Sequence, residues 1–256
     1  MNPLETLAEE AVHLQHSFDP TFVFGGVTQY TLYMLICFVI TLLVVLTVGK
    51  RLTLVPTSKF ANMVEYGYEF VKKDMGEGAI GQGYKKHLPF LATLFFFILI
   101  CNFVGLIPGA KAATGSISVT WALAAISFVY FNYWGVKAHG GWGYIKSIAP
   151  SGLPKVMVPV IWFFEFISLV LRVLTLAVRL YGNMFAGHMV LGIFALATSV
   201  FISAGIQGDF IYFLPPVGWM ALLIAMYALE VLVAFLQAYV FTTLSAVYIG
   251  LATSEH

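Results

Sequence analysis

The sequence predicts an all-α polytopic membrane protein that forms a single integral membrane domain over residues 1–256. Its composition is the first reason, because 60% of the 256 residues are hydrophobic and 10% are charged, whereas a soluble domain has about 45–50% apolar and about 25% charged residues. The mean hydropathy of +0.90 agrees. The second reason is the recurrence of apolar runs that can cross about 30 Å of hydrocarbon as a helix, which takes roughly 20 residues.

Composition and short motifs exclude several other classes of protein. The net charge of +1 and the lack of a basic tract argue against a nucleic-acid partner. Cys37 and Cys101 each lie in an apolar run, so we expect packed thiols and no metal site. No P-loop occurs, so we expect neither a bound nucleotide nor another cofactor. Residues 1–29 are acidic and polar, unlike a secretory signal, and are expected to form an N-terminal segment.

Three apolar runs predict upright membrane-spanning helices, at residues 30–48, 88–107 and 117–136. The first run is closed by a Lys-Arg pair, and the second is stopped by Pro-Gly. Between these two runs, residues 58–75 form a mixed stretch whose apolar residues recur every three or four positions. This spacing predicts an amphipathic helix that lies at the membrane surface.

Two further apolar tracts, residues 156–203 and 213–251, are too long for ordinary spans. Straight helices of these lengths would measure about 72 Å and about 58 Å. A single crossing of the hydrocarbon therefore requires a stronger tilt than the usual range of about 0–40°. The alternatives are tight hairpins or broken, tilted helices, in which partner protein must cover the irregular backbone. Gly182, Gly187 and Gly192 would permit a bend, and the sequence leaves these arrangements open.

The distribution of lysine and arginine predicts the orientation. With three spans before the long tracts, ten of these residues fall on one side of the membrane: Lys50, Arg51, Lys59, Lys72, Lys73, Lys85, Lys86, Lys137, Lys146 and Lys155. Lys111 alone falls on the other side. The positive-inside rule then predicts a cytoplasmic C-terminus and an N-terminus outside. We expect Lys111 and the interfacial lysines to be solvated.

Seven polar residues lie inside the two long tracts: Glu165, Arg172, Arg179, Asn183, His188, Glu230 and Gln237. The first three are spaced by seven, which is 700° of helical rotation, so they share one stripe with Ser168 and Thr175 near it. Glu230 and Gln237 are also seven apart and share a stripe on the second tract. Two such stripes predict either a polar seam between two helices or a path for an ion.

Arg179 is the residue in this set that most needs an explanation. An arginine at the centre of a membrane helix costs about 2.5–3.5 kcal/mol. No acid lies within four positions of it, and Glu165 is about 21 Å away along the helix axis. Its counter-charge must come from elsewhere in the fold or from another subunit. The other polar residues have simpler alternatives: an ion pair between Glu165 and Arg172, and packing or hydrogen bonds between helices for the rest.

Three segments resemble subunit a of the F-type ATP synthase, the proton-path subunit of its membrane sector. They are "PFLATLFFFILICNFVGLIPG", "LRVLTLAVRLYGNMFAGHMVLG" and "LEVLVAFLQAYVFTTLSAVYIGLATSEH". The resemblance covers most of the chain in order, and it is weak over the first thirty residues. It implies two long, strongly tilted helices that face a ring of c subunits. It also implies a non-catalytic subunit of a bacterial inner membrane, with the c-ring and the peripheral-stalk b subunits as partners.

The resemblance also implies roles for single residues. Arg179 matches the family's essential arginine, whose partner is the membrane-embedded carboxylate of each passing c subunit. Asn183 matches the asparagine four residues after this arginine, and Gln237 matches the glutamine that faces it from the last helix. Glu165 matches an acid toward the cytoplasmic half-channel. His188 and Glu230 match two positions that line the opposite half-channel. The last two residue types are exchanged relative to a well-known bacterial pattern.

Two other functions remain open on the residues alone. A stand-alone proton or cation transporter would need an internal acid facing Arg179, or an inverted repeat of spans. A purely structural membrane anchor would leave seven intramembrane polar residues without a reason.

Overall fold

The computed structural model describes residues 22–24, 27–50, 59–107, 109–147, 157–206 and 215–253. Five helices in this part of the chain are long and apolar enough to cross a membrane, which confirms the all-α polytopic class. They are α2 (Gln29–Lys50), α4 (Leu88–Gly105), α5 (Ile117–His139), α7 (Val158–Ile206) and α8 (Pro215–Thr253). Residues 1–21, 58, 156 and 213–214, which belong to predicted elements, lie outside the described residues.

Shorter elements connect these helices. Strands β1 (Phe22–Phe24) and β2 (Val27–Thr28) form an antiparallel pair just before α2. Helix α3 (Lys59–Phe70) continues directly into the π-helical segment η1 (Val71–Ile80), followed by the 3₁₀ turn η2 (Tyr84–Lys86). The 3₁₀ turn η3 (Ala113–Gly115) lies between α4 and α5, and α6 (Gly141–Ser147) follows α5.

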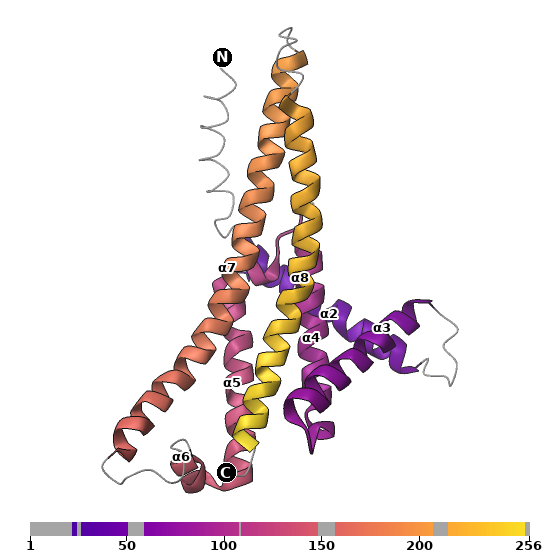
Figure 1. Ribbon diagram of the computed structural model, residues 1–256. Coiled ribbons are helices and arrows are strands. Elements are labelled where there is room, and N and C mark those ends of the chain that lie inside the picture. Colours follow the sequence, from indigo (N-terminus) through magenta and orange to yellow (C-terminus); the bar gives the residue numbers. More distant parts are fainter. Residues whose placement is uncertain are drawn as a thin grey trace.

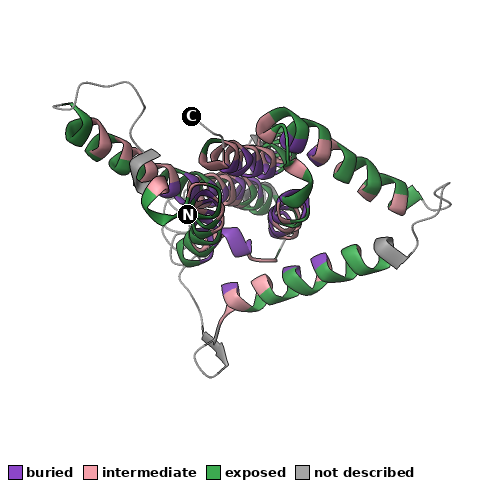
Figure 2. Ribbon diagram, turned by 90° about the horizontal axis from the view of Figure 1, so that it is seen from below, coloured by how far each residue is buried: buried purple, intermediate pink, exposed green. Residues whose placement is uncertain are grey.

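The long helices α7 and α8 run antiparallel and lie side by side in the upper part of the molecule, and the lower half of α7 diverges from α8 (Figure 1). Helices α4 and α5 pack across their lower halves, and α3 projects to one side (Figure 1). Figure 2, seen from below, shows buried residues where the central helices face one another, whereas α2 and α3 are mostly exposed. The exposed apolar surface is therefore large, as expected for helices that contact lipid or other subunits.

Each long tract is one continuous helix. Helix α7 has 49 residues and α8 has 39, so their ideal lengths are about 74 Å and about 58 Å. Gly182, Gly187 and Gly192 all lie within α7, and none of them breaks it. The hairpin alternative is therefore wrong for the first tract, because backbone hydrogen bonding continues through all three glycines.

The core forms where α4 meets α5, α7, α8 and η1. Large side chains from α4 and α8, such as Phe95 and Phe241, are fully buried there together with Leu180 of α7. Alanines such as Ala177 and Ala238 are also fully buried in this cluster. Small residues let helix backbones approach closely, and this close packing drives helix association in membranes.

Buried polar side chains join the helices at specific points. The Asn102 amide of α4 donates to the Ala234 carbonyl of α8 at 3.1 Å, and the Thr114 hydroxyl donates to the Asn102 Oδ1 at 2.9 Å. The Ser127 hydroxyl of α5 donates to the Ser245 hydroxyl of α8 at 2.8 Å. Hydrogen bonds of this kind contribute about 0.6 kcal/mol each on average, and they also define which helix faces meet.

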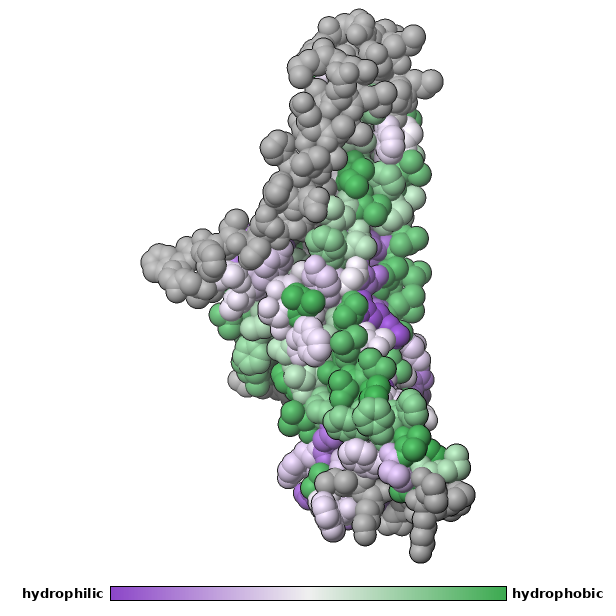
Figure 3. Space-filling view, turned by 90° about the vertical axis from the view of Figure 1, so that its left-hand side faces the viewer, coloured by the Kyte–Doolittle hydropathy of each residue, from purple (hydrophilic) through white to green (hydrophobic). Residues whose placement is uncertain are grey.

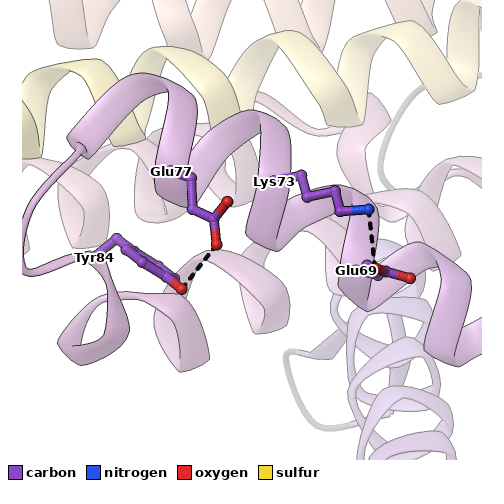
Figure 4. A network of polar contacts seen from close by, with 4 residues as sticks. All are labelled: Glu69, Lys73, Glu77 and Tyr84. Atoms are coloured by element: carbon purple, nitrogen blue, oxygen red, sulfur yellow. Dashed lines mark hydrogen bonds and ion pairs between the residues drawn. The ribbon is translucent and has the colours of Figure 1, made fainter.

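The segment after α3 is held by its own polar network (Figure 4). Lys73 and Glu69 form an ion pair at 3.0 Å, and the hydrogen bond to Glu69 raises the pKa of Lys73. The Tyr84 hydroxyl donates to the Glu77 Oε1 at 2.9 Å, which raises the pKa of Tyr84. The amphipathic stretch is α-helical to Phe70 and then π-helical to Ile80, which is longer than the predicted end at residue 75.

The packing of α2 against α4 gives a direct test of this fold. Cys37 of α2 and Cys101 of α4 are fully buried in one cluster with Ala113. Disulfides form where two Cα atoms are about 4.4–6.8 Å apart. We expect iodine, which partitions into lipid, to oxidise this pair to a disulfide while two iodide ions and two protons form.

Maleimide labelling after denaturation measures the outcome. The oxidised wild-type chain should lose both free thiols, whereas the Cys101→Ser variant should keep a free thiol at Cys37. Full labelling of both cysteines after oxidation of the wild-type chain would contradict the contact between α2 and α4.

Candidate functional site

The lower half of α7 carries an ion pair that is satisfied within the chain. The Glu165 Oε2 lies 3.7 Å from the Arg172 Nη2, with the two side chains 42% and 33% exposed. The Arg172 guanidinium also lies 5.4 Å from the centre of the Tyr248 ring of α8, within the range of a cation–π contact. Arg172 therefore has an anionic partner on its own helix and an aromatic partner on the neighbouring one.

An open groove of about 460 Å³ follows this stripe, and we call it the Arg179 groove. Helix α8 lines it with Leu244 and Tyr248. Helix α7 lines it with the polar residues of the predicted stripe, which are Ser168, Arg172, Thr175 and Arg179. The Thr175 hydroxyl donates to the Leu171 carbonyl at 2.7 Å, so its hydrogen-bonding capacity is partly used by the helix itself. The structure therefore brings four of the predicted polar residues to one surface depression.

Arg179 is exposed at the end of this groove. Within the part of the chain that the structure describes, it makes no ion pair and no side-chain hydrogen bond. Large exposed apolar side chains surround it along α7, among them Leu171, Leu174 and Val178. Figure 3 shows the left-hand side of the molecule of Figure 1 as a largely hydrophobic face in which hydrophilic residues form a narrow strip. The charge of Arg179 is thus presented on an apolar surface.

A second depression of about 280 Å³ lies further along α7, and we call it the His188 hollow. It is lined by Phe185 and His188 of α7, Tyr30 of α2, Gly115 of η3 and residues 109–112. A Cβ on Gly105 would lie 3.3 Å from the His188 Nε2, so the absence of a side chain there makes room for the imidazole. Arg179 lies at the end of the groove that is nearer to the hollow in sequence and along the helix.

Glu230 is the most deeply placed acid of the site, with 3% of its surface exposed. Its carboxyl group packs directly against the backbone of Gly187, in the space that a Cβ would occupy. Its Oε1 is buried and has no hydrogen-bond partner among the described residues. Only a glycine at position 187 leaves room for this carboxyl group.

Four buried polar atoms without a hydrogen-bond partner among the described residues belong to the predicted site: Asn183 Nδ2, His188 Nε2, Glu230 Oε1 and Gln237 Nε2. The one other atom of this kind in the described ranges is Thr243 Oγ1. Buried polar groups nearly always have a partner, from protein or from ordered water. Since these four atoms come from α7 and α8, ordered water beside these two helices would satisfy them.

His188 and Glu230 are not directly joined. No hydrogen bond or ion pair connects them across the described part of α7 and α8. The carboxyl group of Glu230 lies on Gly187, the residue before His188, while the His188 Nε2 is directed toward Gly105. The two groups therefore occupy adjacent positions, with the helix backbone between them.

Two contacts define the antiparallel register of α7 and α8. Gly187 meets Glu230, and Arg172 meets Tyr248. Gln237 comes seven residues after Glu230, so it lies at the level of the α7 turn formed by residues 179–183. This register accounts for the alignment of the two polar stripes that the sevenfold spacing predicts.

Three residues of the site were missed by sequence reasoning. Gly187 seats Glu230, Asn102 holds α8 between Glu230 and Gln237, and Lys111 lines the His188 hollow. Lys111 was expected to be solvated; the structure places it, half-buried, at the edge of the hollow. The lone amide of Asn102 in an apolar run was a sequence signal for a buried hydrogen-bond partner. Gly187 and Lys111 had no such signal in the sequence.

Comparison with known proteins decides the family. The family model for the "ATP synthase A chain" matches residues 31–250. The chain belongs to this family. Relatives named "ATP synthase subunit a" include those of Chloroherpeton thalassium, 39% identical over 237 residues (90% of this chain, 67% of the relative), and of Pelagibacter ubique, 38% identical over 231 residues (90% and 88%). The "ATP synthase subunit a 2" of Prosthecochloris aestuarii is 38% identical over 247 residues (92% and 72%).

Membership has direct consequences. The chain is a membrane-sector subunit of an ATP synthase, it takes part in ATP synthesis and proton transport, and it is not catalytic by itself. The five apolar helices agree with an integral membrane subunit. The interpretation as a purely structural anchor is therefore wrong.

The contact between the Glu230 carboxyl group and Gly187 predicts the effect of a substitution at position 187. The variant Gly187→Ala places a methyl group where the carboxyl group now lies, so Glu230 must move. Because misplacement of a reacting group by about 1 Å can cost about 100-fold, we expect passive proton conductance to fall on the order of tenfold or more. The measurement uses membrane vesicles from which the ATP-hydrolysing head has been removed.

Gly182→Ala is the matched control on the same helix. A Cβ on Gly182 has no atom within 4 Å, and alanine favours a helix over glycine. This variant should conduct protons like the wild-type complex. Equal conductance of both variants would mean that the position of Glu230 does not matter for proton flow.

Proposed function

We propose that this chain is the proton-translocating stator subunit of the membrane sector, in which two half-channels and Arg179 couple proton flow to rotation of a c-subunit ring. One observation carries the proposal: Arg179 is an exposed charge on an apolar face, without an ion-pair partner among the described residues, between two depressions lined by polar groups. An intramembrane charge of this kind marks a functional site.

The Arg179 groove is proposed as the cytoplasmic half-channel. Glu165, Ser168 and Arg172 lie along its lower part or beside it. The orientation follows from the positive-inside rule, which puts the lysine-rich ends of α2, α4 and α5 and the C-terminus in the cytoplasm and the N-terminus outside. The membrane is proposed to be a bacterial inner membrane, as in the bacterial relatives of the chain.

The His188 hollow is proposed as the half-channel from the outside. A proton would pass His188, Glu230 and Asn183, whose buried polar atoms have no hydrogen-bond partner among the described residues. It would then neutralise a carboxylate on the passing c subunit. A neutral carboxyl group enters lipid at low cost and a carboxylate does not, so the ring rotates in the direction that carries protonated sites away.

Arg179 separates the two half-channels. Its guanidinium stays charged at any attainable pH, so it favours the ionised form of the opposing c-subunit carboxylate and promotes proton release. The same charge repels a proton or metal cation that would leak between the depressions. Gln237, at the level of Arg179, has a buried amide that can orient the guanidinium or the carboxylate. A potential of 100 mV supplies about 2.3 kcal/mol for each charge that crosses.

The apolar face around Arg179 is the proposed contact with the c-ring. Exposed side chains of α7 and α8 form it, among them Leu171, Leu174, Val178, Leu232 and Leu236. The peripheral-stalk b subunits are further proposed partners. A stand-alone transporter is less well supported, since Glu165 pairs with Arg172 and Glu230 is seated on Gly187. Neither acid supplies the internal partner that such a transporter would need.

Replacement of Arg179 tests the proposal. In Arg179→Ala, ATP-driven proton pumping should be lost while the complex still assembles. Arg179→Lys should also fail, because a compact ammonium lacks the planar fork of a guanidinium. Fluorescence quenching in inverted membrane vesicles measures pumping, and immunoblotting measures assembly.

Arg172→Ala is the control for Arg179. Arg172 has the same charge on the same helix, but its partners are Glu165 and Tyr248 within the chain, so this variant should retain a substantial part of the pumping. Substantial pumping in Arg179→Ala would refute the proposed role.

Exchange of His188 and Glu230 tests whether they form a proton relay. If they do, the double variant His188→Glu with Glu230→His should retain part of the passive proton conductance, and each single change should lose more. The measurement covers about pH 5.5 to about pH 8.5, which brackets imidazole titration. The double variant His188→Asn with Glu230→Gln keeps polar groups but removes both carriers. Near-normal conductance with an unchanged pH profile in that variant would exclude both residues from the path.

A further inference from the structure

Lys111 has no role in the function proposed above, although it lies at the site. By sequence it is the one lysine or arginine on the outer side of the predicted membrane. It follows Gly109, whose φ of 87° makes the turn after α4. This turn brings the chain back over the end of α4, so that residues 109–112 line the His188 hollow.

Lys111 and His188 share this hollow of about 280 Å³ from two different elements. The Lys111 side chain is half-buried, so water screens its charge less than it would screen that of an exposed lysine. The lysine and the imidazole are therefore neighbours in one small hollow. Partial burial lowers the pKa of Lys111.

The other titratable groups near His188 come from two helices. Tyr30 of α2 lines the same hollow, and Glu230 of α8 lies against Gly187, one residue before His188. Tyr30 is neutral near pH 7, and α4 presents Gly105, which has no side chain. Among the residues that line the hollow, Lys111 is thus the cation that faces the imidazole.

We propose that Lys111 sets the pH dependence of the outer half-channel, because it places a positive charge in the same small hollow as the imidazole of His188. This inference rests on the proposed function of the His188 hollow. A relay group that holds its proton at neutral pH transfers it slowly, since transfer is fastest when the affinities of donor and acceptor are matched to the working pH. The same charge repels metal cations at the mouth of the hollow.

The test compares pH profiles of passive proton conductance in vesicles from which the ATP-hydrolysing head has been removed. Lys111→Gln removes the charge and keeps a polar side chain that is one atom shorter, so the midpoint that depends on His188 should move to higher pH by about half a unit or more. Lys111→Arg restores the charge and should restore the wild-type midpoint. Lys137→Gln, a change of equal charge near the far end of α5 beside Trp134, should leave the midpoint unchanged.

A salt titration of the unaltered complex provides a second measurement that needs no variant. High ionic strength screens the Lys111 charge, so the wild-type midpoint should move toward that of Lys111→Gln, whose own midpoint should change little. An unchanged midpoint in Lys111→Gln overturns the inference, as does a failure of Lys111→Arg to restore it. A wild-type midpoint that does not respond to salt also counts against it.

The failure of this inference can be told apart from failure of the proposed function. If His188→Asn with Glu230→Gln conducts normally, the His188 hollow is not the proton path and the proposed function fails. If that double variant blocks conductance while Lys111→Gln leaves the midpoint unchanged, the path stands and only the role of Lys111 is refuted.

Discussion

The contact between Gly187 and Glu230 is the constraint on which the rest of the site depends. A carboxyl group can lie against the α7 backbone only because position 187 has no side chain. This contact sets the distance between α7 and α8 and their antiparallel register. The register in turn brings Gln237 to the level of the turn that contains Arg179. In any other register, the polar stripes of α7 and α8 would lie at different levels along the helix pair.

Polar groups in this protein divide into two kinds by how they are satisfied. Asn102, Thr114, Ser127 and Ser245 have partners at 2.8–3.1 Å across helix interfaces, so they fasten helices together. The side-chain atoms of the α7–α8 seam have no such partners among the described residues. Since an unpaired buried polar group is costly, a fold that retains four of them on α7 and α8 gives up stability for something other than cohesion.

Sequence reasoning could predict stripes and helices but not contacts. The sevenfold spacing of Glu165, Arg172 and Arg179 follows from helix geometry alone, and the lengths of the apolar tracts require something unusual. Length alone could not separate a continuous helix from a hairpin, because both satisfy the backbone. Gly187 was considered as a bend, whereas its role is to make room for a side chain 43 residues away. Contacts of that kind depend on the register of two helices, which no local pattern encodes.

The two depressions differ in chemistry in a way that suits opposite tasks. The Arg179 groove is open and contains hydroxyls and an ion pair already satisfied within the chain, so it can hydrate a departing proton without holding it. The His188 hollow is smaller and combines an imidazole with a half-buried ammonium, next to a buried carboxyl group. The proton affinity of groups in such an environment depends on the charges and the burial of their neighbours. In the proposed function, control over proton uptake therefore belongs to the hollow side, and Arg179 keeps the two sides apart.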